Sequence, residues 1–255
     1  MEKKRVIAVC GKGGVGKTAF TAMMARMMKN RDDVGRLLVI DADPALGLPR
    51  TLGITVEHTM GDVRNAILEA ATSQEEEKTE IVNTLDYMVM ESLVEADGYA
   101  FLAMGRTDAK GCFCSINDIL KAAIHSLTDS FDTILIDGEA GLEQINRQVM
   151  DRLDTLIILS DASHRGRQTI SYIQKMVEEE QVIFCRKTGV VFNRVRMPEE
   201  LLRQETKEMG LEVFGIIPPD EAIERTDFEG DPLWELSEDS PALMAVRKIC
   251  DEVLS

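Results

Sequence analysis

Long hydrophobic runs are missing from this 255-residue chain. No apolar stretch approaches the ~18 residues that a membrane-spanning helix needs. The N-terminal sequence MEKKRVIAVCGKGG leads directly into a glycine-rich motif and has none of the features of a signal peptide. We therefore expect a cytoplasmic location and no membrane partner.

Positive charge is also scarce. Lysine and arginine number 29 against 45 aspartates and glutamates, which gives a formal net charge of −16. Broad binding to nucleic acid or to an anionic membrane depends on a positive surface, so this balance argues against both kinds of partner. A local basic patch is still compatible with the composition.

Histidine and cysteine are few as well. The three histidines, His58, His125 and His164, are isolated in the sequence, and each fits a structural or solvated role better than that of a metal ligand. Five cysteines, an odd number, in a chain without an export signal predict reduced thiols. A cysteine pair at metal-ligand spacing is therefore considered first as a ligand set.

Short β-rich apolar runs alternate with longer helical patterns, which is typical of a parallel sheet with crossover helices. We expect strands at 5–10, 36–41, 87–92, 132–137, 155–160, 188–193 and 212–218, and helices at 17–30, 61–71, 115–129, 165–178, 198–209 and 241–254. These elements predict one α/β domain over 1–255, with a doubly wound, mostly parallel sheet of about seven strands. The methionines of the helix at 17–30 are expected in the core.

The sequence GKGGVGKT satisfies the phosphate-loop pattern G-x-x-x-x-G-K-S/T, directly after a predicted strand and before a predicted helix. Its glycines allow backbone N–H groups to face a phosphate, Lys17 can reach the β- and γ-phosphates, and Thr18 can bind Mg²⁺. The nucleotide-binding residues predicted from this loop are Gly11, Gly13, Gly14, Val15, Gly16, Lys17, Thr18 and Ala19.

The same loop carries a second lysine, Lys12, at its tip. A solvated side chain is the simple interpretation. Alternatively, a cation that points away from its own phosphates can stabilise the charge on a nucleotide held by a facing subunit, as an arginine finger does. This second interpretation requires a homodimer.

With these two lysines, GKGGVGKT resembles the deviant Walker A motif, K-G-G-x-G-K-S/T, of the dimerising P-loop ATPases that include MinD, ParA, the nitrogenase iron protein and CooC. The resemblance implies a P-loop NTPase fold, ATP and Mg²⁺ as cofactors, and ATP hydrolysis. It also implies that Lys12 is the signature lysine that crosses the dimer interface. Further motifs in the expected order extend the resemblance over nearly the whole chain.

Two aspartate motifs follow predicted strands. In VIDADPALG, Asp41 and Asp43 are acceptors suited to Mg²⁺ and its waters or to the orientation of an attacking water. The resemblance places Asp43 in switch I as the residue that helps to activate that water. In LIDGEAGLE, Asp137 lies where parallel sheets place ligands, and it is expected to hold Mg²⁺ in a switch II loop whose Glu139 departs from the family's usual proline.

The adenine pocket is expected from two later segments, VVFNRV and GIIPPDE. An asparagine at a strand end offers both a donor and an acceptor to a purine edge. The resemblance implies that Asn193 and the backbone near Pro218 form this pocket, which favours ATP over GTP. Arg194 is expected to lie over the ring.

A C-x-C pair, Cys112 and Cys114, lies in the long segment 95–117. Two thiolates are too few for a zinc, nickel or iron site. A two-fold axis would supply the missing ligands from a second copy. The other cysteines, Cys10, Cys185 and Cys250, fit buried small hydrophobes. A redox-sensitive pair is the alternative for the two loop cysteines.

The C-x-C pair resembles that of the CooC-type accessory ATPases, which serve nickel insertion into carbon monoxide dehydrogenase. Our leading hypothesis is therefore an ATP-dependent metallochaperone that works as a homodimer on a client metalloenzyme such as carbon monoxide dehydrogenase, with Zn²⁺ or Ni²⁺ at the shared cysteines. A MinD- or ParA-like positioning ATPase and an ATP-dependent reductase with a bridging iron–sulfur cluster are the alternatives. The amphipathic segment 242–255 carries too little positive charge for a strong membrane anchor.

Overall fold

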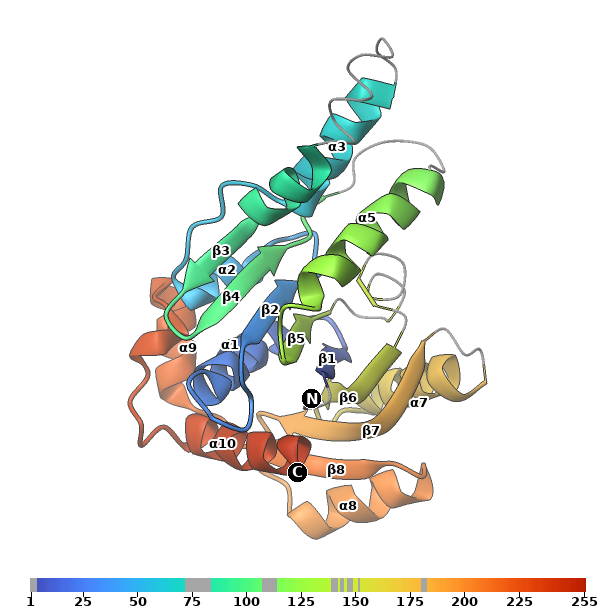
Figure 1. Cartoon of the computed structure of the whole chain (residues 1–255). Coiled ribbons are helices and arrows are strands. Elements are labelled where there is room, and N and C mark those ends of the chain that lie inside the picture. The colour runs from blue at the N-terminus through green and yellow to red at the C-terminus, as the bar shows by residue number, and fades with distance from the viewer. Residues whose placement is uncertain are drawn as a thin grey trace.

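Figure 1 shows the computed structural model, which describes residues 4–71, 84–106, 114–138, 142, 145, 149–150, 152–179 and 183–255. The described residues form an eight-stranded sheet in the order β3-β4-β2-β5-β1-β6-β7-β8. Neighbouring strands are parallel except at the edge, where β3 runs antiparallel to β4. The strands are β1 (Arg5–Gly11), β2 (Leu37–Asp41), β3 (Leu93–Ala96), β4 (Tyr99–Ala103), β5 (Thr133–Asp137), β6 (Arg152–Ser160), β7 (Phe184–Asn193) and β8 (Glu212–Ile217). The predicted α/β class is confirmed, with eight strands where about seven were expected.

Helices cover both faces of the sheet (Figure 1). Those on one face are α1 (Lys17–Met28), α2 (Gly47–Leu52), the 3-10 turn η1 (Leu233–Glu235) and α10 (Pro241–Leu254). Those on the other face are α3 (Met60–Ala71), α5 (Cys114–Thr128), α7 (His164–Glu178) and α8 (Glu199–Glu208). A further helix, α9 (Glu221–Glu229), has no buried residue.

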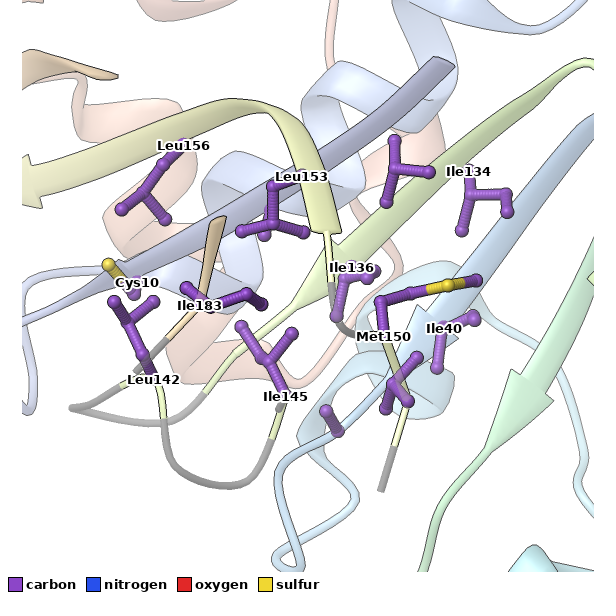
Figure 2. Close-up of a cluster of buried hydrophobic side chains, with 14 of the residues drawn as sticks. Cys10, Ile40, Ile134, Ile136, Leu142, Ile145, Met150, Leu153, Leu156 and Ile183 are labelled. Carbon is purple, nitrogen blue, oxygen red and sulfur yellow. The ribbon is translucent and has the colours of Figure 1, made fainter. Parts of the chain in front are cut away.

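Alternate residues of each inner strand pack into two separate apolar layers. In β1, Ala8 and Cys10 belong to the layer that Figure 2 shows in part, whereas Ile7 and Val9 belong to the layer beneath α1 and α10. A strand that is buried on both faces needs apolar residues at every position, which is why these strands appear in the sequence as continuous hydrophobic runs. The α1 methionines Met23, Met24 and Met28 are fully buried in the second layer, as expected for core residues.

The prediction of a strand at 87–92 is wrong. Residues 84–91 are helical, and the strand begins only at Leu93. Val89 is buried while Tyr87 and Met90 are exposed, which is the one-sided pattern of a surface helix. A short apolar run does not distinguish a helix from a strand by periodicity alone, and here tertiary packing decided.

The long segment 95–117 is not a single loop, because it contains most of a β-hairpin. Strands β3 and β4 are joined by Asp97 and Gly98, and Gly98 has a φ of +82°. An Asp-Gly pair between two strands is a strong hairpin signal. Helix α5 then begins at Cys114, so the second cysteine of the C-x-C pair is the first residue of a helix.

The carboxyl ends of four central strands meet at one edge of the sheet. The register pairs Asp41 of β2 with Asp137 of β5, and Gly11 of β1 with Leu159 of β6. Ligands of open α/β sheets bind at this edge. The fold therefore brings four loops that are far apart in the sequence to a common place.

Among the described residues, no helix combines the length and the apolar character needed to cross a bilayer. The amphipathic C-terminal helix α10 buries its apolar side inside the protein, where Leu243, Val246 and Ile249 pack in the layer beneath α1. This apolar side is thus already occupied by protein contacts.

Candidate nucleotide-binding site

The phosphate loop connects β1 to α1 and depends on glycines at two kinds of position. Gly11 lies so close to β6 that a Cβ atom would collide with the carbonyl oxygen of Leu159. Gly14 and Gly16 adopt left-handed conformations, with φ of +74° and +95°, that residues with side chains rarely tolerate. Since Gly16 also precedes the first turn of α1, the backbone N–H groups of the loop and of the helix N-terminus are directed to one anion site.

Lys17, the first residue of α1, folds back toward this loop. Its Nζ atom donates to the carbonyl oxygen of Gly11 at 3.2 Å. The ammonium group therefore lies over the loop, at the position from which a phosphate-binding lysine acts. The next residue, Thr18, lies beside Gly47 at the start of α2, where an added Cβ would be 3.5 Å from the Thr18 methyl group.

Two buried aspartates lie side by side behind the loop. Burial raises the pKa of Asp137 to about 7, and the charge of Asp41 adds to this rise. The hydroxyl groups of Thr18 and Thr21 and the charge of Lys17 act in the opposite direction. The Thr21 hydroxyl donates to Oδ1 of Asp137 at 3.2 Å, whereas Oδ2 is buried and has no hydrogen-bond partner among the described residues.

An unpartnered buried carboxylate oxygen is costly unless a ligand satisfies it. The donor set around Oδ2 of Asp137 consists of hard oxygen atoms, which suit Mg²⁺. The residues Thr18, Asp41 and Asp137 therefore fit the magnesium ion that a P-loop ATPase uses.

Asp41 is held by backbone donors on both oxygens. It accepts from the N–H of Asp43 at 3.0 Å and from the N–H of Leu48 at 3.1 Å. Burial raises the pKa of Asp41 to about 6, with those two hydrogen bonds acting to lower it. Asp43 in turn accepts from the N–H of Ala45 at 2.9 Å. The loop from Asp41 to the start of α2 is thus built around its own aspartates, and Asp43 lines the cavity described next.

A cavity of about 680 Å³ extends from the phosphate loop toward α9. Asn193 and Arg194, at the end of β7, and Pro218, after β8, line it as expected for an adenine pocket. The Asn193 amide donates to the carbonyl oxygen of Val15 at 2.8 Å, which ties this side of the cavity to the phosphate loop. Arg194 has a left-handed φ of +58° and donates to the carbonyl oxygen of Gly14 at 3.4 Å.

Lys12 lies on the outer side of the loop, away from Lys17. Its Nζ atom is 2.8 Å from Oδ2 of Asp161, at the end of β6, and 3.4 Å from Oγ of Ser163. Hydrogen bonds from Lys12 and Ser163 lower the pKa of Asp161, although its partial burial acts to raise it. The Lys12 and Asp161 side chains are 30% and 38% exposed, so solvent screens this ion pair and the lysine is readily released.

The structure thus brings together around one loop the predicted residues Lys12, Lys17, Thr18, Asp41, Asp43, Asp137, Asn193, Arg194 and Pro218.

Sequence reasoning missed three residues near this loop, Thr21, Asp161 and Arg50. Asp161 follows the apolar run TLIILS directly, so the strand-end rule that indicated Asp137 could also have indicated Asp161. Thr21 and Arg50 carry no comparable signal, because helix geometry and the packing of distant segments place them.

The predicted metal site of the C-x-C pair lies mostly outside the described residues. Cys112 is not among them, and only the backbone of Cys114 is. Glu139 and Gly141 of the predicted switch II loop are likewise outside, although Leu142 and Ile145 of the same segment are fully buried against the sheet (Figure 2). In the part of the chain that the structure describes, no three histidine, cysteine or acidic side chains cluster as a metal site.

The remaining cysteines are packed or half-buried. Cys10 and Cys250 are fully buried, as predicted, whereas Cys185 is only partly so. Burial raises the pKa of the Cys250 and Cys185 thiols to about 12. These thiols are therefore protonated and fit small apolar side chains better than metal ligands.

Comparison with known proteins agrees with this site. An uncharacterized ATP-binding protein of Methanocaldococcus jannaschii is 38% identical over 98% of both chains. The carbon monoxide dehydrogenase accessory protein CooC of Rhodospirillum rubrum is 27% identical over 91% of this chain and 90% of its own. The structure of the septum site-determining protein MinD of Pyrococcus horikoshii, complexed with Mg-ADP, superposes with a TM-score of 0.69 at 21% identity, over 98% of this chain and 96% of its own.

The family comparison covers most of the chain. Residues 6–233 match the CobQ/CobB/MinD/ParA nucleotide binding domain. This match includes the phosphate loop, both buried aspartates, Asn193, Arg194 and Pro218, and it ends at Leu233, which also lines the cavity. The chain belongs to the CobQ/CobB/MinD/ParA family and is an ATP-binding P-loop ATPase.

Proposed function

We propose that this ATPase is a maturation factor that delivers nickel to carbon monoxide dehydrogenase or a related metalloenzyme. It would act in the cytoplasm as a single-domain protomer of a homodimer. The observation that carries the proposal is the combination of two features: the C-x-C pair, Cys112 and Cys114, and the similarity to CooC over nine tenths of the chain.

In this proposal the chain's own residues divide the work on ATP. Lys17 and the loop N–H groups hold the β- and γ-phosphates, and Asn193 with the backbone near Pro218 holds the base. Asp43 orients the attacking water. Thr18, Asp41 and Asp137 would hold Mg²⁺, which supplies charge neutralisation on the phosphates when it is bound.

Lys12 supports the dimeric part of the proposal. It lies on the outer face of the loop and is held by a screened ion pair to Asp161, so a partner's nucleotide can compete for it at little cost. Two protomers that exchange Lys12 across a two-fold axis would each complete the other's charge stabilisation. The same axis would supply four thiolates from Cys112 and Cys114 and their symmetry mates, enough for a tetrahedral zinc or nickel site.

The test is the metal content of the purified dimer. With ATP and either Ni²⁺ or Zn²⁺ supplied, we expect one ion per dimer, measured by inductively coupled plasma mass spectrometry after gel filtration. Replacement of both Cys112 and Cys114 by serine should remove the ion and leave the Kd for ATP unchanged. Cys185→Ser is the matched control, since Cys185 is a half-buried strand residue.

Three results would overturn the proposal of a metallochaperone. Equal metal in the double variant would exclude the C-x-C site. Iron with visible charge-transfer absorbance after anaerobic purification would indicate an iron–sulfur reductase. ATP-dependent co-sedimentation with anionic vesicles or DNA, without bound metal, would indicate a positioning ATPase.

A further inference from the structure

A buried hydroxyl group on α1 contacts the carboxylate at the end of β5. Thr21 is fully buried, and its Oγ1 atom donates to Oδ1 of Asp137 at 3.2 Å. The two residues are 116 positions apart in the sequence. Thr21 also lies outside the phosphate-loop motif, which ends at Thr18.

The direction of this hydrogen bond is unusual for a threonine inside a helix. A helical threonine can donate to the carbonyl oxygen three or four residues earlier in its own helix. Such bonds occur in α2, α7, α8 and α9, where the donors are Thr51, Thr169, Thr206 and Thr226. Thr21 instead donates across to the sheet. Its hydroxyl group therefore serves Asp137 rather than its own helix.

The main chain around Asp137 is fixed, so only its side chain is left to be oriented. The carbonyl oxygen of Asp137 accepts from the N–H of Ala42 at 2.9 Å, and the N–H of Gly138 donates to the carbonyl oxygen of Val9 at 2.8 Å. Rotation about χ2 of an aspartate has a broad, roughly two-fold profile. A side-chain partner is therefore needed to select one orientation of the carboxylate, and Thr21 is that partner.

The neighbouring carboxylate is held in a different way. Asp41 accepts backbone N–H groups on both of its oxygens, from Asp43 and from Leu48. In Asp137 the Thr21 hydroxyl occupies Oδ1, whereas Oδ2 is buried and has no hydrogen-bond partner among the described residues. Asp137 is thus the carboxylate of this pair that presents a free oxygen to a ligand.

We propose that Thr21 is a positioning residue, whose hydroxyl group fixes the Asp137 carboxylate so that Oδ2 is available to Mg²⁺ or to a water molecule bound to it. Loss of a residue that orients a metal-binding side chain typically lowers metal affinity by a factor of ~10–100. This inference rests on the Mg²⁺ role proposed above for Asp137. It does not depend on a metal at Cys112 and Cys114.

The test measures how ADP binding to the full chain depends on Mg²⁺. Isothermal titrations with ADP are carried out in EDTA and at a series of Mg²⁺ concentrations. Thr21→Val keeps the shape of the side chain and removes the hydroxyl group. We expect it to raise about tenfold the Mg²⁺ concentration that gives half of the gain in ADP affinity, with no change in EDTA. Thr21→Ser retains the hydroxyl group and should respond to Mg²⁺ nearly as the parent chain does.

Thr206→Val is the matched control. Thr206 is also a buried helical threonine, but its hydroxyl group donates within α8. This variant should keep the parent Mg²⁺ dependence. A parent-like Mg²⁺ dependence in Thr21→Val, the same shift in Thr206→Val, or equal weakening of ADP binding with and without Mg²⁺ would each overturn the proposal.

Asp137→Asn separates the role of Thr21 from the role of Asp137 itself. If Thr21 acts through Asp137, adding Thr21→Val to Asp137→Asn should cause no further shift in the Mg²⁺ dependence. A further shift would show that Thr21 acts by another route and would overturn the proposal. Parent-like Mg²⁺ dependence in Asp137→Asn would overturn the Mg²⁺ role of Asp137 and this inference together, whereas the same result in Thr21→Val alone removes only the role of Thr21.

Discussion

At the scale of single residues, the most consequential feature is a carboxylate pair whose charges are poorly compensated. Asp137 and Asp41 end neighbouring parallel strands in direct register, so the sheet itself holds two like charges together. Burial adds a desolvation cost, and the pKa of each carboxyl rises well above its ordinary value of 3.8. Mg²⁺ and a nucleotide would relieve this cost, which links ligand binding to stability.

This pair predicts an unusual dependence of stability on pH. The folded protein binds the Asp137 proton more tightly than the unfolded chain, so the contribution of this group to stability is lost as pH rises from about 4 to about 7. Without ligand, Asp137→Asn should therefore show a smaller decline in Tm between pH 5 and pH 8 than the parent chain, by on the order of 5 °C.

The comparison uses differential scanning calorimetry with chelator present. Any packing cost of the amide is independent of pH and cancels between the two pH values. An identical change in Tm for the parent chain and the variant would show that Asp137 is ionised throughout this range.

At the scale of elements, Asp220 caps α9 and also supports the start of α10, whose own N-cap is Ser240. Asp220 accepts from the N–H of Ala222 at 2.9 Å at the start of α9. Its other oxygen accepts from the Ser240 hydroxyl at 2.6 Å and from the N–H of Ala242 at 3.2 Å at the start of α10. These hydrogen bonds lower the pKa of Asp220, although its burial acts to raise it. Because α9 buries none of its own residues, this carboxylate is a principal attachment of the cavity wall.

Asp220→Ala should cost about 2–3 kcal/mol in the free energy of unfolding, since it removes the cap of α9 and leaves the buried donors of Ser240 and Ala242 without an acceptor. Urea denaturation measures the change. Ser163→Ala, which removes the single cap that Ser163 provides to α7 through the N–H of Gly166, is the matched control and should cost about 1 kcal/mol. A similar small loss in both variants would contradict the role of Asp220 at the start of both helices.

Elements also show where periodicity is ambiguous. Six of the seven predicted strands and all six predicted helices lie close to their predicted places, because burial on both faces of a strand or on one side of a helix leaves a clear pattern in the sequence. The helix at 84–91 and the β3–β4 hairpin were missed. Their apolar runs are only a few residues long, and the packing of α3 and α5 around them is not local information.

At the scale of the whole molecule, the dimer proposed above depends on the different positions of the two lysines. Lys17 serves its own loop, whereas Lys12 is directed to the outer face, where Asp161 holds it. An assembled dimer would replace the Asp161 carboxylate by a partner's phosphate. Because the ion pair is screened, this exchange should cost under about 1 kcal/mol.

Lys12→Ala should therefore bind ATP with nearly the parent affinity but hydrolyse it roughly 10³-fold more slowly, as expected when a finger residue is lost. Turnover is measured by phosphate release at saturating ATP, and association by analytical ultracentrifugation. Lys17→Ala is the contrasting variant, which should lose ATP binding itself. Parent-like turnover in Lys12→Ala, or turnover per chain that does not change with protein concentration, would argue for a monomeric ATPase.

The sequence by itself determined the phosphate loop and the α/β class and indicated most of the candidate ligand-binding residues, because these depend on local spacing: glycines before a helix, and acceptors directly after buried strands. Tertiary structure alone decided which of these residues meet. Strand order placed Asp41 against Asp137, β6 brought Asp161 to Lys12, and the contact of α2 with α9 brought Arg50 into the cavity. Such contacts join segments between about 100 and 180 residues apart, and no short-range pattern records the order in which strands pair.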